Sequence, residues 1–227
     1  MSISQGEVGQ VRVAQAIPPK HPLTLATILT VLAGFLDAAA YIELNHLYVS
    51  FMSGNSTHLG LSIPTADLSQ ILGVLIVIGA FVFGAFAGTW VSDNSGPHSL
   101  ILTLAAETAM LFIAVILAMM SALHPSFFVV AVAMGMQNSL HQVVAGADVG
   151  RGFITGALFS LGQSLARLKD GNGQEWRAAS NFLSWLVFVI GASIGAVSLS
   201  HFGLVACLTG ALAVALVLLL FLWLRRL

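Results

Sequence analysis

Six apolar segments, each long enough to cross a lipid bilayer, constrain the fold of this chain more than any other feature. A helix that crosses roughly 30 Å of hydrocarbon needs about 17–25 apolar residues. The segments cover residues 23–44, 69–91, 100–122, 127–145, 181–200 and 202–224, with turn-forming residues at 93–97, 124–125 and 170–173. We therefore expect an all-α fold, a polytopic membrane helix bundle with six spans.

The composition agrees with a surface that faces lipid. Apolar residues make up 58 % of the 227 residues and charged residues only 7 %, whereas a soluble domain carries about 25 % charged residues. The net charge of −1 offers no field that would attract nucleic acid. The single cysteine, Cys207, excludes an internal disulfide and a cysteine-based metal site.

Two shorter apolar segments, 51–63 and 153–168, occupy matching places in the two halves of the chain. One begins Phe51-Met52-Ser53-Gly54 and the other Phe153-Ile154-Thr155-Gly156. Each is too short or too polar for a full span, so we expect two re-entrant or half-helices. Each half then consists of a span, a short segment and two spans, which predicts two inverted-topology repeats, 23–122 and 126–227, after a mobile cytoplasmic tail at 1–22.

The basic residues predict the orientation. If the short segments do not cross the membrane, all eight Lys and Arg fall on one side. Cytoplasmic loops carry the excess of Lys and Arg, so both termini are expected in the cytoplasm. If both short segments crossed, only Arg151 would move to the other side, so the charge pattern favours six spans without demanding them.

Several of these motifs together resemble the YoaK-like family of bacterial inner-membrane proteins of unknown function. They are Gly34-Phe35-Leu36-Asp37, Tyr41, Phe51-Met52-Ser53-Gly54-Asn55, Gly135-Met136-Gln137-Asn138 and Thr155-Gly156. Ser53 stands where the family more often has threonine, which keeps the hydroxyl. The resemblance implies a multi-pass protein of the bacterial inner (plasma) membrane, and it supplies neither a substrate nor catalytic residues.

Two carboxyl groups lie well inside predicted spans. Asp37 is in the first span and Glu107 in the third. A charge in hydrocarbon is costly, so such residues face the bundle interior and often carry protons or bind ligands. Asp37 is the first candidate for proton coupling and Glu107 the second. The alternatives are that Asp37 hydrogen-bonds a helix break and that Glu107 reaches the headgroups or pairs with a backbone break.

The end of the fourth span carries a polar stripe that includes Gln137, Asn138 and His141. Gln137 and His141 are four residues apart and share a helix face. A lipid-facing helix would not carry this stripe, so we expect it to line a ligand or ion pathway. Hydrogen bonding between helices is the alternative.

Ser53-Gly54-Asn55 and Thr155-Gly156 suggest two helix starts. A hydroxyl residue can N-cap a helix, and the free amides of a helix N-terminus attract anions. We predict that these two starts meet near the bilayer midplane and bind substrate together with Asp37, Gln137, Asn138 and His141. Tight packing through small residues is the alternative interpretation.

The function predicted from these residues is a small secondary transporter or permease for a polar or anionic small solute, possibly proton-coupled. A passive channel, an intramembrane enzyme and a structural partner are alternatives. We expect no enzyme activity, because no convincing nucleophile is present, and no cofactor, since no phosphate-binding or dinucleotide motif occurs. The seven scattered histidines do not predict a metal site. The expected partners are membrane lipid, a small-molecule or ion substrate and possibly a second copy in a homodimer, with no nucleic acid.

Overall fold

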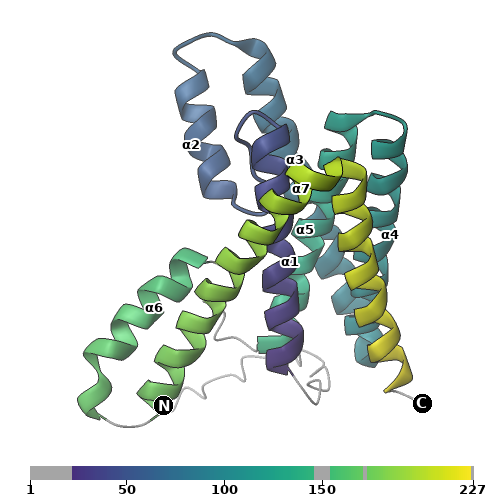
Figure 1. The fold of residues 1–227 in the computed structure, drawn as a ribbon. Helices are drawn as coiled ribbons and strands as arrows, with labels where there is room; N and C mark the ends of the chain where they lie inside the picture. The colour runs from purple at the N-terminus through teal and green to yellow at the C-terminus, as the bar shows by residue number, and fades with distance from the viewer. Residues whose placement is uncertain (1–21, 146–153, 171–172, 226–227) are drawn as a thin grey trace, which may run out of the picture.

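The computed structural model describes residues 22–145, 154–170 and 173–225, and the regular elements over this part are all helices (Figure 1). The predicted tail at 1–22 lies outside the described residues except for Pro22, where the first helix begins. The helices are α1 (Pro22–Glu43), α2 (Met52–Ser62), α3 (Leu68–Asn94), α4 (Ser99–Met119), α5 (Leu123–Ala145), α6 (Ile154–Ala166) and α7 (Gln174–Leu224), with single 3₁₀ turns η1 (Gly96–His98) and η3 (Leu168–Asp170).

Four helices have the length and hydropathy of a membrane span: α1, α3, α4 with the turn before it, and α7. α5 has 23 residues and is long enough to cross. It carries the polar stripe, and it packs against α1, α3 and α4. α2 and α6, with 11 and 13 residues, are too short to span, as the sequence predicts. The protein is thus a helical membrane bundle.

α7 contains a sharp bend. Its 51 residues include Gly203, whose φ of 76° and ψ of 174° are not helical. Glycine adopts this conformation without the Cβ clash that strains other residues. Figure 1 shows two arms meeting at the bend, which correspond to the two spans predicted at 181–200 and 202–224. The first arm begins earlier than predicted, at Gln174.

α3 also begins slightly earlier than predicted, because Asp67 caps it. An Asp67 carboxylate oxygen accepts hydrogen bonds from the Ser69 and Gln70 amides at 3.1 and 3.2 Å and from the Ser69 hydroxyl at 2.6 Å. These bonds, led by the one from the Ser69 hydroxyl, lower the pKa of Asp67 below its usual value of 3.8. Asp67 therefore caps α3 as an ionised group at neutral pH.

Glycines let two pairs of helices cross with their backbones in contact. At the α1–α7 crossing, a Cβ built on Gly34 would collide with the carbonyl oxygen of Phe188, and one on Gly191 with that of Val31. Small residues at a helix interface permit this close approach in membranes. Here a tight crossing requires glycine from both helices.

The α3–α5 crossing repeats this arrangement residue for residue. A Cβ on Gly135 would collide with the carbonyl oxygen of Phe81, and one on Gly84 with that of Val132. A further glycine on each long helix, Gly88 on α3 and Gly195 on α7, meets the partner backbone one turn later. The corresponding positions are Val31 and Val132, Gly34 and Gly135, Phe81 and Phe188, Gly84 and Gly191, Ala85 and Ala192, and Gly88 and Gly195.

The short helices lie toward opposite ends of the bundle (Figure 1). α2 packs against α3, and α6 packs against the first arm of α7. α4 packs against α5 and α7, and its buried Leu104 and Leu111 belong to two separate apolar clusters of the core. The starts of α2 and α6 both reach the space between the two glycine crossings.

Candidate functional site

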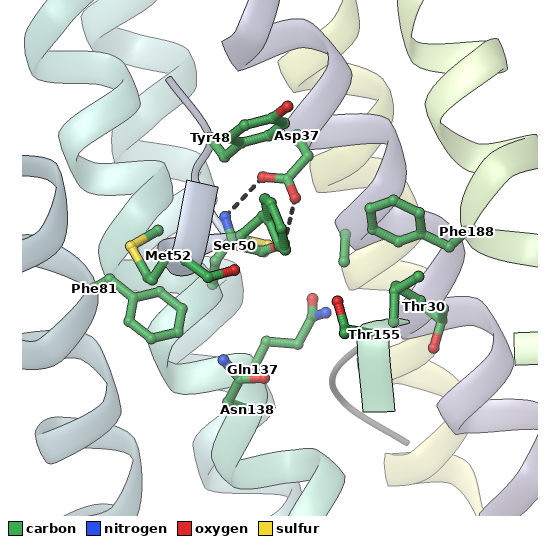
Figure 2. Close-up of a pocket in the computed structure, with 15 residues that line it drawn as sticks. Thr30, Asp37, Tyr48, Ser50, Met52, Phe81, Gln137, Asn138, Thr155 and Phe188 are labelled. Atoms are coloured by element: carbon green, nitrogen blue, oxygen red, sulfur yellow. Dashed lines mark hydrogen bonds between the residues drawn. The ribbon is translucent and has the colours of Figure 1, made fainter. Parts of the chain in front are cut away.

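A cavity of about 610 Å³ lies between the first turns of α2 and α6 (Figure 2). Met52 and Ser53, the first two residues of α2, line it from one end, and Ile154 and Thr155 of α6 line it from another. Four further helices, α1, α3, α5 and α7, and the segment before α2 contribute the remaining described side chains. The lining residues are Thr30, Ala33, Asp37, Tyr48, Ser50, Phe51, Met52, Ser53, Phe81, Met134, Gln137, Asn138, Ile154, Thr155 and Phe188.

Asp37 lines the cavity, but its carboxylate is occupied by the segment that joins α1 to α2. Oδ1 accepts hydrogen bonds from the amides of Val49 at 2.8 Å and Ser50 at 2.7 Å, and Oδ2 accepts one from the Ser50 hydroxyl at 2.6 Å. Only 3 % of Asp37 is exposed. Of the two interpretations of this residue, the geometry favours the structural one, in which the carboxylate stabilises a helix break.

Asn55 holds the same segment from the α2 side. Its side-chain oxygen accepts from the Tyr48 amide at 2.9 Å, and its Nδ2 donates to the Tyr48 carbonyl at 2.7 Å. Asn55 is fully buried and does not line the cavity. It acts on the site by fixing Tyr48, which does line it.

Gly54 contacts the aromatic rings of Tyr48 and Phe51, which line the cavity, and does not line the cavity itself. A Cβ there would lie 2.6 Å from the Phe51 ring and 2.8 Å from the Tyr48 ring. Those two rings contact each other edge to face, with centroids 5.2 Å apart. A larger residue at position 54 would therefore displace two side chains of the cavity wall.

The predicted helix caps are wrong for α2. Its N-cap is Phe51, with no side-chain cap, so Ser53 lies inside the first turn. The preceding amides of Val49 and Ser50 bind Asp37 instead. In α6, Thr155 lines the cavity and Gly156 is half-buried outside the lining, and the residue before Ile154 lies outside the described residues.

The polar stripe of α5 divides into members with different roles. Gln137 is buried, and its Nε2 donates to the Leu29 carbonyl of α1 at 2.9 Å, so it joins two helices while lining the cavity. Asn138 is half-buried and lines the cavity beside it. Figure 2 shows the Gln137 amide and Thr155 near one another, across the cavity from Asp37. The His141 side chain lies outside the described part of the structure.

The described lining of the cavity is chemically mixed. Asp37 is its one charged side chain among the residues that the structure describes, and the rings of Tyr48, Phe51, Phe81 and Phe188 cover its walls. The amides at the starts of α2 and α6 supply partial positive charge. Among the described residues no group of three His, Cys, Asp or Glu side chains is placed to hold a metal ion.

Glu107, the second predicted proton-coupling residue, does not line this cavity. It is fully buried on α4, and neither carboxyl oxygen has a hydrogen-bond partner within the described structure. The two intramembrane carboxyl groups therefore differ sharply in their surroundings.

Two lining residues, Phe81 and Phe188, are not among the predicted site residues, although the sequence contains a signal for them. Phe81 and Phe188 open the same pattern, Phe-Val-x-Gly-Ala-x-x-Gly, at 81–88 and 188–195. Their carbonyls contact the glycines of the opposite helices at the two crossings. The other missed residues, such as Thr30, Ser50 and Met134, have no comparable signal.

Comparison with known proteins finds a family model and two transmembrane relatives. A family model described as a protein of unknown function (DUF1275) matches residues 25–222. The UPF0700 transmembrane protein RA0705 of Rhizobium meliloti (strain 1021) is 30 % identical over 200 residues, which cover 86 % of this chain and 83 % of that protein.

A second relative is the UPF0700 transmembrane protein YoaK of Bacillus subtilis (strain 168). It is 27 % identical over 145 residues, which cover 61 % of this chain and 64 % of YoaK. No solved structure matches the chain significantly. The family model covers most of the chain and one relative is 30 % identical over most of both lengths, so this protein belongs to the DUF1275 family of YoaK-like transmembrane proteins.

Proposed function

We propose that this protein is a small secondary transporter that binds a polar small solute in the cavity between α2 and α6. The observation that carries the proposal is the cavity itself, about 610 Å³ and lined by residues from both halves of the chain. Ligand pockets commonly measure about 300–1,000 Å³. Discontinuous helices that end at a central cavity are a recurring design of transporter sites.

The paired glycine crossings support two inverted repeats. α1 with the first arm of α7 and α5 with α3 make equivalent contacts at equivalent residues. α2 and α6 lie toward opposite ends of the bundle, as inversion about an axis in the membrane plane requires (Figure 1). Asp37 and Asn138 fall at corresponding positions of α1 and α5 in this pairing, and Gly54 corresponds to Gly156.

The lining favours a neutral solute with a flat or apolar face over an anion. Asp37 carries negative charge, and the lining residues that the structure describes include no Lys, Arg or His. Within this described lining, the partial positive charge comes from the amides of the two helix N-termini. Aromatic walls suit a planar or partly apolar body, and the Asn138 amide and the Ser53 and Thr155 hydroxyls supply hydrogen-bonding groups.

The proposal includes placement in the bacterial inner membrane with both termini in the cytoplasm, as the Lys and Arg distribution indicates. It treats the protein as a transporter rather than an enzyme, since the hydroxyl that lies beside a carboxylate in the described lining, that of Ser50, is engaged in holding the segment before α2 to Asp37. A channel of the same architecture would move solute only down its gradient. Flux measured with and without a proton gradient separates the two functions.

Ligand-dependent stabilisation of the purified protein tests the cavity. The thermal midpoint would be measured against a panel of nucleobases, amino acids, sugars and small anions. A ligand that binds only the folded state raises stability by mass action, about 2.7 kcal/mol at one hundred times its Kd. We expect a neutral planar solute to give the largest shift.

Two cavity variants and one matched control identify the binding place. Asn138→Leu and Thr155→Val remove polar groups from the lining and should abolish the shift. Thr209→Val removes a hydroxyl from the exposed face of α7, where it bonds only its own helix at 2.7 Å, and should retain the shift. A shift that survives in both cavity variants would contradict binding at this site.

A further inference from the structure

Glu107 is a titratable group in the bundle core. Within the described structure it lacks the hydrogen bonds and charged neighbours that stabilise an ionised carboxylate. It is 0 % exposed, and both of its carboxyl oxygens lack hydrogen-bond partners in the described structure. Buried polar groups almost always have partners, and each exception calls for an explanation. An ionised carboxylate in this place would lose its hydration without compensation.

No charged side chain that the structure describes on the helices packed around Glu107 compensates it. α4 packs against η1, α3, α5 and α7. None of the titratable groups described on these elements interacts with Glu107: His98 in η1, Asp93 on α3, His124 on α5, and Glu175, Arg177, His201, Cys207 and Arg225 on α7. Burial without a described partner therefore favours the neutral acid over the carboxylate.

Thr103 adds a second observation on the same helix face. It lies one turn before Glu107, is 1 % exposed, and its hydroxyl also lacks a partner. The neighbouring Thr108, by contrast, donates to the Leu104 carbonyl at 2.7 Å. Three unpartnered polar atoms at one place are the arrangement expected of groups that meet water in a different conformation.

Glu107 is close in the fold to the proposed solute cavity without lining it. Leu104, one turn away on α4, belongs to the same apolar cluster as Leu29 of α1. The Leu29 carbonyl accepts the hydrogen bond of Gln137, which lines the cavity. A shift of α1 or α5 that changes the cavity would also change the packing around α4.

We propose that Glu107, rather than Asp37, takes up and releases the proton that drives solute transport. In this conformation the group is a neutral acid. In a conformation that admits water it loses the proton to that water and becomes a carboxylate, and it is protonated again before the core closes. Asp37 cannot exchange a proton without disturbing its three bonds to Val49 and Ser50. The role in coupling rests on the proposed transport function, whereas the protonation state does not.

Infrared spectroscopy of the full-length protein tests the protonation directly. A neutral carboxylic acid and a carboxylate absorb at different frequencies, and ¹³C labelling of glutamate shifts only the bands of Glu7, Glu43, Glu107 and Glu175. We expect a label-sensitive acid band in the wild type at pH 7 that is missing from Glu107→Gln. Absence of the band from the wild type, or its persistence in the variant, would overturn the proposal. The wild-type measurement needs no variant to fold.

Transport in proteoliposomes tests the coupling. Glu107→Gln should keep solute exchange between the two sides and lose at least tenfold of the accumulation driven by a pH gradient. Glu175→Gln, in the exposed first turn of α7, is the matched control and should accumulate solute normally. Normal accumulation by Glu107→Gln would overturn the coupling role. If the wild type moved no solute, the proposed function would fail, and the acid band would mark Glu107 as a neutral structural group.

Discussion

At the scale of single residues, burial alone does not tell a structural carboxyl from a functional one. Asp37 and Glu107 are both buried in predicted spans, and the sequence ranks Asp37 first as the proton carrier. We propose the opposite order, because Asp37 accepts three hydrogen bonds and Glu107 accepts none within the described structure. The partners of Asp37 are 12 and 13 residues away in a segment without regular structure, and sequence spacing could not predict them.

Replacing Asp37 by Asn should lower stability. The amide keeps one acceptor oxygen but presents an NH₂ group where the Ser50 hydroxyl now donates. Loss of hydrogen bonds to a charged buried group costs about 1.5–3 kcal/mol. Thermal unfolding in detergent would measure the change.

The matched control for this variant is Asp93→Asn at the exposed end of α3, which should leave the midpoint unchanged. An Asp37→Asn protein as stable as the wild type would show that the segment before α2 does not depend on the charge.

At the scale of helices, the sequence predicts the existence of every helix and misplaces some of their starts. Hydrophobic length sets the spans, and the break near Phe202 is realised as the bend at Gly203. The start of α2 is displaced because Asp37, far away in the sequence, binds the amides before it. For the site, five predicted residues do line the cavity: Asp37, Ser53, Gln137, Asn138 and Thr155. Asn55 and Gly54 support its wall instead, which depends on the tertiary placement of Tyr48 and Phe51.

The stability cost of replacing a glycine of α3 should depend on whether that glycine contacts the backbone of another helix. Gly84→Ala places a methyl group against the Val132 carbonyl and should destabilise the protein by about 1–3 kcal/mol, the usual cost of overpacking. Gly191→Ala, its counterpart on α7, should behave alike. Chemical unfolding would measure both variants.

Gly79→Ala is the control on the same helix, because a Cβ there meets nothing within 4 Å. It should be neutral or slightly stabilising, since alanine favours helix over glycine. Equal effects at positions 79 and 84 would contradict a backbone contact at the α3–α5 crossing.

At the scale of the whole molecule, the number of crossings decides where each end of the chain lies. α1, α3, α4, α5 and the two arms of α7 provide six helical segments of membrane length, and α2 and α6 are too short to add crossings. An even number of crossings places the N- and C-termini on the same side. The helical bundle follows from segment length, which is why the sequence predicts it well, whereas the cytoplasmic placement of both termini stays a prediction from the Lys and Arg distribution.

Reporter fusions test this topology in cells. A reporter after Arg225 should be active in the cytoplasm, and one inserted after Thr65, between α2 and α3, should be active on the opposite side. Alkaline phosphatase and a fluorescent protein report the two sides in complementary ways. A C-terminal reporter found outside the cytoplasm would contradict six crossings.

The glycine crossings also divide the bundle into two rigid helix pairs. The two backbones are in direct contact in each pair, which consists of α1 with the first arm of α7 or of α3 with α5. α6 packs against the first pair and α2 against the second. The cavity lies between these two helix pairs, and α4 packs against α5 of one pair and α7 of the other. We expect a tilt of one pair against the other to widen the cavity at one end and to narrow it at the other.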